Sequence, residues 1–276
     1  MEGTRGRHAV ERRQRTLEDA HSVARLTGLP TSGAVPFDPR HGPLPTQTHP
    51  QSRRAEAYHR IGALLSRLEA PAHIVVTSAG AGEGKTAISA NVATALAQRG
   101  SRVLIIDAHL RRPSLAEVFD IPTHFEGLTD YLKGRISWSD AILATDDDLP
   151  DVITVGSTRT RTLLGNGRFD ALMASARHRY DYVVVDLPPV LQQKEALQVA
   201  AAADGTLLVS LLGTTTPSQL SRAAQAMERA KVRVLGVMPN ESRAQIRIPA
   251  PREPQGAHRA TKADQKQTRP AGRHAR

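Results

Sequence analysis

The stretch HIVVTSAGAGEGKT, residues 73–86, decides the fold, because an apolar run passes directly into a glycine-rich loop. The spacing matches a phosphate-binding loop, which lies between a strand and a helix and turns its backbone N–H groups toward phosphates. The helix N-terminus adds the positive end of its dipole. Ala79 stands where the strict pattern begins with glycine, and Gly80, Gly82 and Gly84 supply the freedom that the turn needs. The stretch therefore predicts a nucleotide-binding site.

The loop and the first turn of the following helix supply the residues expected to bind the nucleotide. Lys85 would reach the β- and γ-phosphates, and the Thr86 hydroxyl would ligate Mg²⁺. The full set expected to contact the nucleotide in this stretch is Gly80, Ala81, Gly82, Glu83, Gly84, Lys85, Thr86 and Ala87.

Apolar runs alternate with helical stretches along the body of the chain. The expected strands are 73–78, 102–108, 151–156, 182–187, 206–212 and 232–238, and the expected helices are 55–69, 86–99, 163–178, 194–203 and 217–230, with a short helix within 9–26. The strand runs are nearly continuous in Val, Ile and Leu, as expected of parallel strands that are covered on both faces. The alternation predicts an α/β fold with a doubly wound, mostly parallel sheet of the P-loop NTPase type.

Two acidic residues close strands of this sheet. Asp107 ends the run VLIIDA and Asp186 ends the run YVVVDL. In open α/β sheets ligands bind outside the carboxyl ends of the strands, so both side chains are expected near the phosphate-binding loop. Asp186 matches the acid that holds Mg²⁺ directly or through water in P-loop proteins. We therefore expect Thr86, Asp107 and Asp186 to form a metal site, and Lys85, Asp107 and Asp186 to carry out phosphoryl transfer.

The formal net charge of +10 is confined to the two ends of the 276-residue chain. Residues 1–54 carry a net charge of +4 and residues 241–276 one of +6, while residues 55–240 are neutral. The run 28–52 contains six prolines and no helical or strand period, which is typical of a linker. We therefore expect a disordered basic N-terminal segment (1–54), one P-loop ATPase domain (55–240) and a disordered basic tail (241–276).

The composition excludes several classes of site. Without cysteine the chain has no disulfide, no thiol nucleophile and no zinc–thiolate site. Its nine aromatic residues are too few for base-stacking platforms, so nucleic acid is not an expected partner. No run approaches the roughly 18 apolar residues that span a bilayer, and the first residues lack the apolar core of a secretory signal. We expect a cytoplasmic protein, whose basic ends could touch the inner face of the cell membrane.

The order of the motifs resembles that of the bacterial tyrosine kinases. These motifs are SAGAGEGKT, VLIIDAHLRRPSL, YDYVVVDLPPVL, ADGTLLVSLLGTTTPSQL and VLGVMPN. The family consists of P-loop ATPases of capsule and exopolysaccharide biosynthesis that are related to MinD and ParA, and the resemblance covers roughly residues 55–240. Gly80 stands where MinD and ParA carry their signature lysine, which favours the kinase branch.

The resemblance implies a fold of the MinD, ParA and bacterial tyrosine kinase type and an autophosphorylating protein-tyrosine kinase that uses ATP and Mg²⁺. The family's Walker A motif corresponds to Ala79–Thr86, its second acidic motif to Asp107–Arg111 and its Walker B acid to Asp186. Asn240, past the last strand, matches the family position that approaches the adenine. The expected partners are a membrane-embedded polysaccharide co-polymerase and further copies of the chain.

Departures from the family pattern leave the kinase activity open. His109 replaces the second acid of the D-x-D motif, and only Glu56 remains of the E-x-x-R-x-x-R motif that joins family subunits into rings. The tail lacks the family's tyrosine cluster, and Tyr58 is the candidate phospho-acceptor in the body. The four tyrosines of the chain are Tyr58, Tyr131, Tyr180 and Tyr182. Two alternatives therefore stand beside the kinase: a nucleotide-binding regulator of the co-polymerase that has lost phosphotransfer, and a ParA/MinD-type positioning ATPase.

Overall fold

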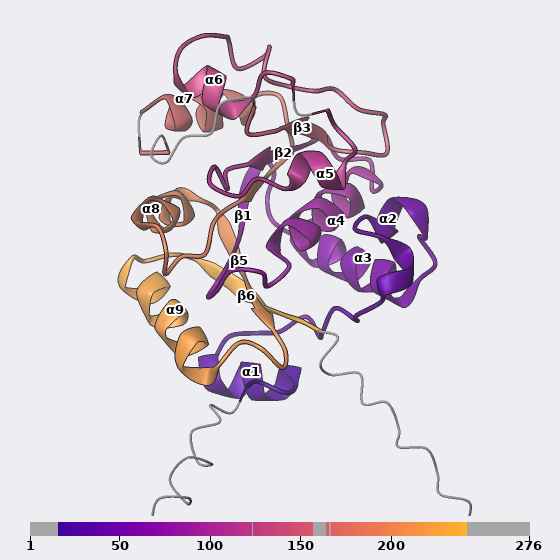
Figure 1. Cartoon of the computed structure of the whole chain (residues 1–276), viewed down its shortest axis with the longest axis vertical. Helices are drawn as coiled ribbons and strands as arrows, with labels where there is room; N and C mark the ends of the chain where they lie inside the picture. Colours follow the sequence, from indigo (N-terminus) through magenta and orange to yellow (C-terminus); the bar gives the residue numbers. More distant parts are fainter. Residues whose placement is uncertain (1–15, 123, 157–163, 166, 242–276) are drawn as a thin grey trace, which may run out of the picture. The chain divides into compact units, whose positions relative to one another are not determined.

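A six-stranded parallel sheet forms the centre of the domain (Figure 1). The computed structural model describes residues 16–122, 124–156, 164–165 and 167–241. The strands are β1 (Ala72–Ser78), β2 (Val103–Asp107), β3 (Asp151–Ile153), β4 (Tyr182–Asp186), β5 (Gly205–Leu211) and β6 (Val234–Asn240), and they pair in the order β3-β2-β4-β1-β5-β6. All five pairings are parallel, which confirms the predicted doubly wound sheet.

Helices cover both faces of the sheet. The elements that pack on one face are α2 (Pro45–Thr48), α3 (Arg53–Leu65), α4 (Lys85–Ala97) and α5 (Leu115–Val118). The elements on the other face are α1 (Ala20–Thr27), α6 (Leu128–Leu132), α7 (Gly167–Ala176), α8 (Lys194–Ala202) and α9 (Pro217–Arg229). Figure 1 shows α3 and α4 on one side of the strands and α8 and α9 on the other. Each face therefore has its own apolar core, because neighbouring side chains of a strand point to opposite faces.

The helix ends follow the signals in the sequence with small shifts. The Thr216 hydroxyl accepts the N–H of Gln219 and the Gln219 side chain accepts the N–H of Thr216, so the predicted capping box opens α9. Gly100 has a φ of +83°, as expected of a glycine that ends a helix. The helix expected within 9–26 is, in the described part, α1 from Ala20 to Thr27.

The expectation of a disordered segment over residues 1–54 is wrong for residues 16–54. We call residues 16–52 the N-terminal strap. Thr31 and Val35 form parallel bridges with Val237 and Asn240 of β6, and the Val35 side chain is completely buried. The strap therefore covers the edge strand of the sheet, where unpaired N–H and C=O groups would otherwise face solvent. The polar and proline-rich composition of the strap does not predict this packing, because only single apolar side chains enter the core.

A buried side chain of α4 fastens the strap to the body. The Asn91 Oδ1 accepts hydrogen bonds from the Thr46 N–H at 3.1 Å and the Thr46 hydroxyl at 2.8 Å. Its Nδ2 donates to the carbonyls of Pro43 at 2.8 Å and Ala87 at 2.7 Å. Both Asn91 and Thr46 are fully buried. Three of these four hydrogen bonds join the strap to α4, and the fourth, to Ala87, lies within α4. The amide therefore adds to the few apolar contacts that the strap makes.

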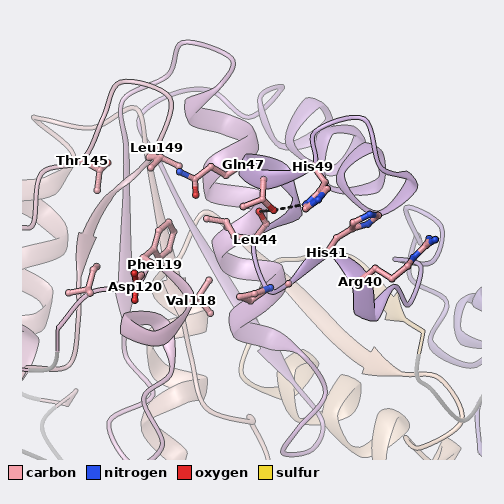
Figure 2. A pocket seen from close by; sticks show the side chains of 14 residues that line it. Arg40, His41, Leu44, Gln47, His49, Val118, Phe119, Asp120, Thr145 and Leu149 are labelled. Carbon is pink, nitrogen blue, oxygen red and sulfur yellow. Dashed lines mark hydrogen bonds between the residues drawn. The ribbon is translucent and has the colours of Figure 1, made fainter.

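A cavity of about 510 Å³ opens between the strap and the end of α5. Figure 2 shows His41 and His49 from the strap on one side, and Phe119 and Asp120 on the other. The two imidazole rings lie 4.3 Å apart, centroid to centroid, and His49 Nδ1 lies 3.0 Å from the Thr48 hydroxyl. None of the residues that line this cavity belongs to the phosphate-binding loop.

The predicted tail, residues 241–276, lies outside the described residues except for Glu241. The Glu241 N–H donates to the Val35 carbonyl at 2.9 Å, so this first residue still belongs to the strap–β6 contact. Among the residues that the structure describes, no helix has the length and apolar character that a bilayer crossing needs.

The strap anchor predicts a stability effect of Asn91→Leu. We expect the free energy of unfolding to fall by about 3 kcal/mol, because the buried Thr46 N–H and the Pro43 carbonyl lose their partner. Urea denaturation followed by circular dichroism measures the change. Thr94→Val on the same helix is the control, since the buried Thr94 hydroxyl has no hydrogen-bond partner in the part of the chain that the structure describes. Equal free energies of unfolding for the two variants would contradict the role of Asn91.

Candidate nucleotide-binding site

The glycine-rich loop lies where the sequence predicts it, between the end of β1 at Ser78 and the start of α4 at Lys85. Gly82 and Gly84 have φ values of +73° and +87°, in the left-handed region that favours glycine. A Cβ atom on Gly84 would also collide with the Asn240 side chain. Two of the predicted loop glycines are thus required by the backbone itself.

Lys85 is largely buried at the base of the loop, with 5% of the residue exposed. Burial lowers the pKa of Lys85, while the charges of Asp186 and Glu83 raise it. Because α4 begins at Lys85, the loop is followed directly by a lysine cation and by the positive end of the helix dipole. The arrangement can bind an anion.

Two carboxylates face each other across neighbouring strands at the carboxyl end of the sheet. The pairing of β2 with β4 places Asp107 opposite Asp186, and both residues are fully buried. Asp186 accepts hydrogen bonds from the Thr86 hydroxyl at 2.6 Å and the Ser89 hydroxyl at 3.2 Å. The predicted metal residues Thr86, Asp107 and Asp186 therefore come from three elements to one place.

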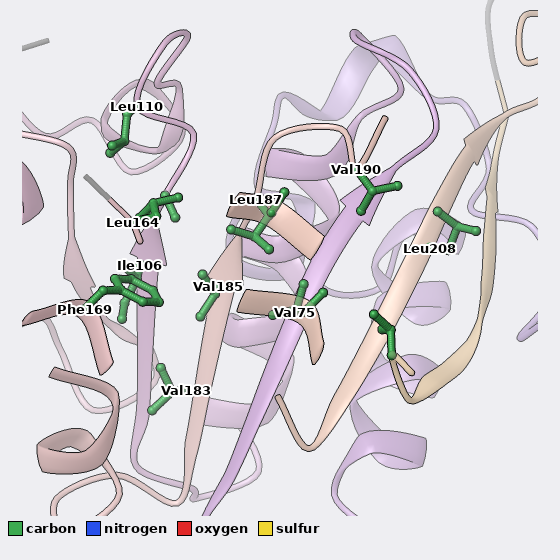
Figure 3. Packing of buried hydrophobic residues seen from close by; sticks show 14 of the residues in the cluster. Val75, Ile106, Leu110, Leu164, Phe169, Val183, Val185, Leu187, Val190 and Leu208 are labelled. Carbon is green, nitrogen blue, oxygen red and sulfur yellow. The ribbon is translucent and has the colours of Figure 1, made fainter. Parts of the chain in front are cut away.

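The apolar core fixes the direction of these two carboxylates. Ile106 and Val185, the residues immediately before them, point into the same core as Val75 of β1 (Figure 3). Because side chains alternate along a strand, Asp107 and Asp186 then turn toward the opposite face, where α4 carries Thr86 and Ser89. A shift of one residue in either strand would bury the carboxylates in the apolar core.

Asp107 accepts three backbone hydrogen bonds. The N–H groups of His109, Ser114 and Leu115 donate to it at 3.0, 3.1 and 3.0 Å. Burial raises the pKa of Asp107 above its ordinary value, although these three donors lower it. The carboxylate thereby shapes the loop after β2 as well as the site.

The pKa of Asp186 is raised to about 7, first by burial and then by the charge of Asp107, against the effect of the Thr86 hydroxyl, Lys85 and the Ser89 hydroxyl. Two buried carboxylates that repel each other are relieved by a cation between them. Carboxylate and hydroxyl oxygens are the ligands that Mg²⁺ takes. The donor set of Thr86, Asp107 and Asp186 therefore fits Mg²⁺.

The structure adds two hydroxyls that the sequence did not reveal. Ser89 lies three residues after Thr86 on α4, a spacing that places both side chains on one face of a helix and could have indicated it. Ser114 donates its hydroxyl to the Thr86 oxygen at 2.9 Å and its N–H to Asp107. No spacing rule links Ser114 to Thr86, 28 residues earlier.

His109 supplies no negative charge to the site, two residues after Asp107. Its imidazole is half-buried, and burial, followed by the charges of Lys85 and Arg112, lowers the pKa of His109 to about 4. The ring is therefore neutral at pH 7. It can accept a proton, but it supplies no carboxylate to a cation.

Glu83 and Asn240 lie at the loop, but the side chains of both contact protein groups. The Glu83 carboxylate turns inward and is 3% exposed. The Asn240 side-chain amide, at the end of β6, donates to the Glu83 carbonyl at 3.2 Å. The expected approach of Asn240 to an adenine stays a prediction.

The four tyrosines are all buried, with exposed fractions of 0% at Tyr58, 7% at Tyr131, 4% at Tyr180 and 5% at Tyr182. The interpretation of Tyr58 as a phospho-acceptor is wrong for the folded chain, because this residue of α3 is enclosed in the core. Burial also raises the pKa of Tyr58.

The sequence matches the model of the ParA family, described as the NUBPL iron-transfer P-loop NTPase, over residues 69–250. It is 33% identical over 198 residues to the tyrosine-protein kinase YwqD of Bacillus subtilis, and this match covers 70% of this chain and 83% of YwqD. It is 31% identical over 172 residues to the tyrosine-protein kinase CpsD of Streptococcus agalactiae, covering 61% and 74%. The kinase domain of Escherichia coli tyrosine kinase ETK is similar in structure, with a TM-score of 0.75 and 27% identity over 82% of this chain and 96% of that domain.

The raised pKa of Asp186 predicts a pH-dependent stability that Asp186→Asn removes. The pKa is 3.8 in the unfolded chain and about 7 in the folded one, so the folded chain binds more protons between these values. The free energy of unfolding of the wild type therefore falls as the pH rises from about 4 to about 7. Without divalent cations, urea denaturation is expected to show a smaller fall for Asp186→Asn. Asp170→Asn, at an exposed carboxylate, is the control, and a wild-type slope for Asp186→Asn would contradict the assignment.

Proposed function

The chain belongs to the bacterial tyrosine kinase family of ParA-type P-loop NTPases, and from this premise we propose that it binds ATP with Mg²⁺ and transfers the γ-phosphoryl group to a tyrosine. The observation that carries the proposal is the meeting of Lys85, Thr86, Asp107 and Asp186 at the carboxyl end of the sheet. The family model and the similar kinases thus confirm the resemblance that the order of the motifs predicted. We place the protein in capsule or exopolysaccharide biosynthesis.

The loop and four of the predicted side chains have roles in this reaction. Lys85 neutralises charge on the β- and γ-phosphates, and the loop from Ala81 to Gly84 offers backbone N–H groups to them. Thr86, Asp107 and Asp186 would hold Mg²⁺, which supplies positive charge to the phosphates when it is bound.

The transfer also needs an acceptor for the phenolic proton. The tyrosine oxygen forms the new bond to the γ-phosphorus while the bond to the ADP oxygen breaks, and the hydroxyl loses its proton. Because a phenol has a pKa of about 10, a nearby base assists the attack. We assign this role to Asp107, and the neutral His109 ring lies two residues further along the chain.

The phosphorylated tyrosine belongs to another protein in this proposal. All four tyrosines of the chain are buried, so none reaches the site from the surface of the same or a second folded copy. We propose the membrane-embedded polysaccharide co-polymerase as the partner, which would bring the chain to the inner face of the membrane. Homo-oligomerisation is proposed from the family alone, since Glu56 of α3 is the one residue kept from its ring motif.

A non-catalytic regulator is the second candidate function, and His109 is the observation that favours it. A neutral imidazole where the family has a carboxylate leaves nucleotide binding intact and weakens the charge arrangement around Mg²⁺. The ParA match also keeps a positioning ATPase as an alternative, against which Gly80 stands in place of the signature lysine.

The nucleotide site predicts that Lys85→Ala abolishes measurable ATP binding, because the phosphates lose the cation at the base of the loop. Isothermal titration calorimetry with Mg²⁺ and ATP measures it. Lys194→Ala, at an exposed lysine of α8, is the matched control and should bind as the wild type does. Unchanged affinity of Lys85→Ala would refute the site.

The kinase and the regulator differ in what His109→Asp does. We expect this variant to gain phosphotransfer, because it restores the family's second carboxylate two residues after Asp107. The assay incubates the protein with Mg²⁺, ATP and a synthetic glutamate–tyrosine copolymer, and mass spectrometry detects phosphotyrosine. His178→Asp, at an exposed histidine, is the control. ATP binding with no phosphotyrosine from the wild type or from His109→Asp would favour the regulator.

A further inference from the structure

Glu83 is a carboxylate inside the phosphate-binding loop that faces the protein interior. Its Oε2 accepts the N–H of Gly80 at 3.0 Å, which closes the loop on itself. Its Oε1 accepts the hydroxyl of Thr215 at 2.5 Å. The loop is thus tied to the turn between β5 and α9, 132 residues further along the chain.

The Thr215 hydroxyl is fixed in its direction. Thr215 is 1% exposed, and its oxygen accepts the N–H of Leu211 at 2.8 Å. A hydroxyl has a single hydrogen to donate, and at Thr215 that hydrogen goes to Glu83. Thr215 therefore acts on the loop through one defined bond.

The N-terminal strap holds the turn that carries Thr215. The Leu17 N–H donates to the Thr215 carbonyl at 3.0 Å, and the Leu17 carbonyl accepts the N–H of Gly213 at 2.7 Å. The Leu17 side chain is itself buried, with 4% exposed. A residue at the start of the strap is thus two hydrogen bonds away from Glu83.

A second connection reaches Glu83 from β6. Asn240 donates to the Glu83 carbonyl, and the Asn240 carbonyl accepts the N–H of Leu212 at 2.8 Å. The strap contacts this end of β6 as well, because the Val35 N–H donates to the Pro239 carbonyl at 2.8 Å. Strap, turn and edge strand therefore converge on one residue of the loop.

We propose that Thr215 is a positioning residue for nucleotide binding, which holds the Glu83 carboxylate inward and thereby keeps the loop open to phosphates. This inference rests on the proposed function. Without the Thr215 donor, the buried carboxylate has one partner fewer, and hydration favours its turning outward. An outward carboxylate on this loop repels phosphates more strongly than an inward one does, because it lies closer to them.

The test is the affinity for Mg²⁺-ADP of Thr215→Val, measured by calorimetry. Valine has the shape of threonine without the hydroxyl, and we expect binding about tenfold weaker, which corresponds to about 1.4 kcal/mol. Thr215→Ser restores the donor and should bind nearly as the wild type does. Thr206→Val, on β5 just before the turn, is the matched control, because among the described residues the buried Thr206 hydroxyl has no hydrogen-bond partner. Urea denaturation establishes that the variants are folded.

A double-mutant cycle separates the route through Glu83 from a general loosening of the turn. In a Glu83→Ala background, Thr215→Val should cause no further loss of affinity, because the acceptor is already gone. If Thr215→Val alone unfolds, Thr215→Ala takes its place in the cycle.

Each outcome bears on one claim. Absence of ADP binding by the wild type overturns the proposed function and the positioning role with it. Binding by the wild type with equal affinities for Thr215→Val and Thr206→Val overturns the positioning role alone. A loss in the Glu83→Ala background as large as in the wild-type background also overturns it, because Thr215 would then act by another route.

Discussion

β2 and β4 pair in the register that places Asp107 opposite Asp186, and both carboxylates are removed from water. Two buried carboxylates this close to each other are tolerated only with hydrogen-bond donors around them and a cation to balance their charge. The donors come from the loop after β2 and from the hydroxyls of Thr86 and Ser89 on α4. The path of the chain around the carboxyl end of the sheet follows from satisfying these two groups.

The sheet and the centre of the site could be predicted from the sequence because their signals are local. Each strand is a continuous apolar run, and the loop from Gly80 to Thr86 has a fixed spacing that chemistry requires. Asp107 and Asp186 could be assigned because strand ends of a parallel sheet meet at one edge.

The strap and the supporting residues could not be predicted, because their contacts are distant in the sequence and involve common residue types. Val35 is one apolar residue in a proline-rich run, and Thr46 finds its partner in Asn91, 45 residues away. Thr215 is one of three adjacent threonines, and no spacing rule marks which of them reaches Glu83. Low apolar content indicated disorder in the strap, where hydrogen bonds to the body and single buried apolar side chains provide the order.

The burial of every tyrosine has a consequence for how such a protein is switched. A kinase that phosphorylates its own exposed tail keeps a chemical record of its past activity, and that record alters its next encounter. The folded chain has no exposed tyrosine that could be phosphorylated in this way. As far as tyrosine is concerned, a change of state in the folded chain then lasts only as long as the ligand or partner that causes it stays bound.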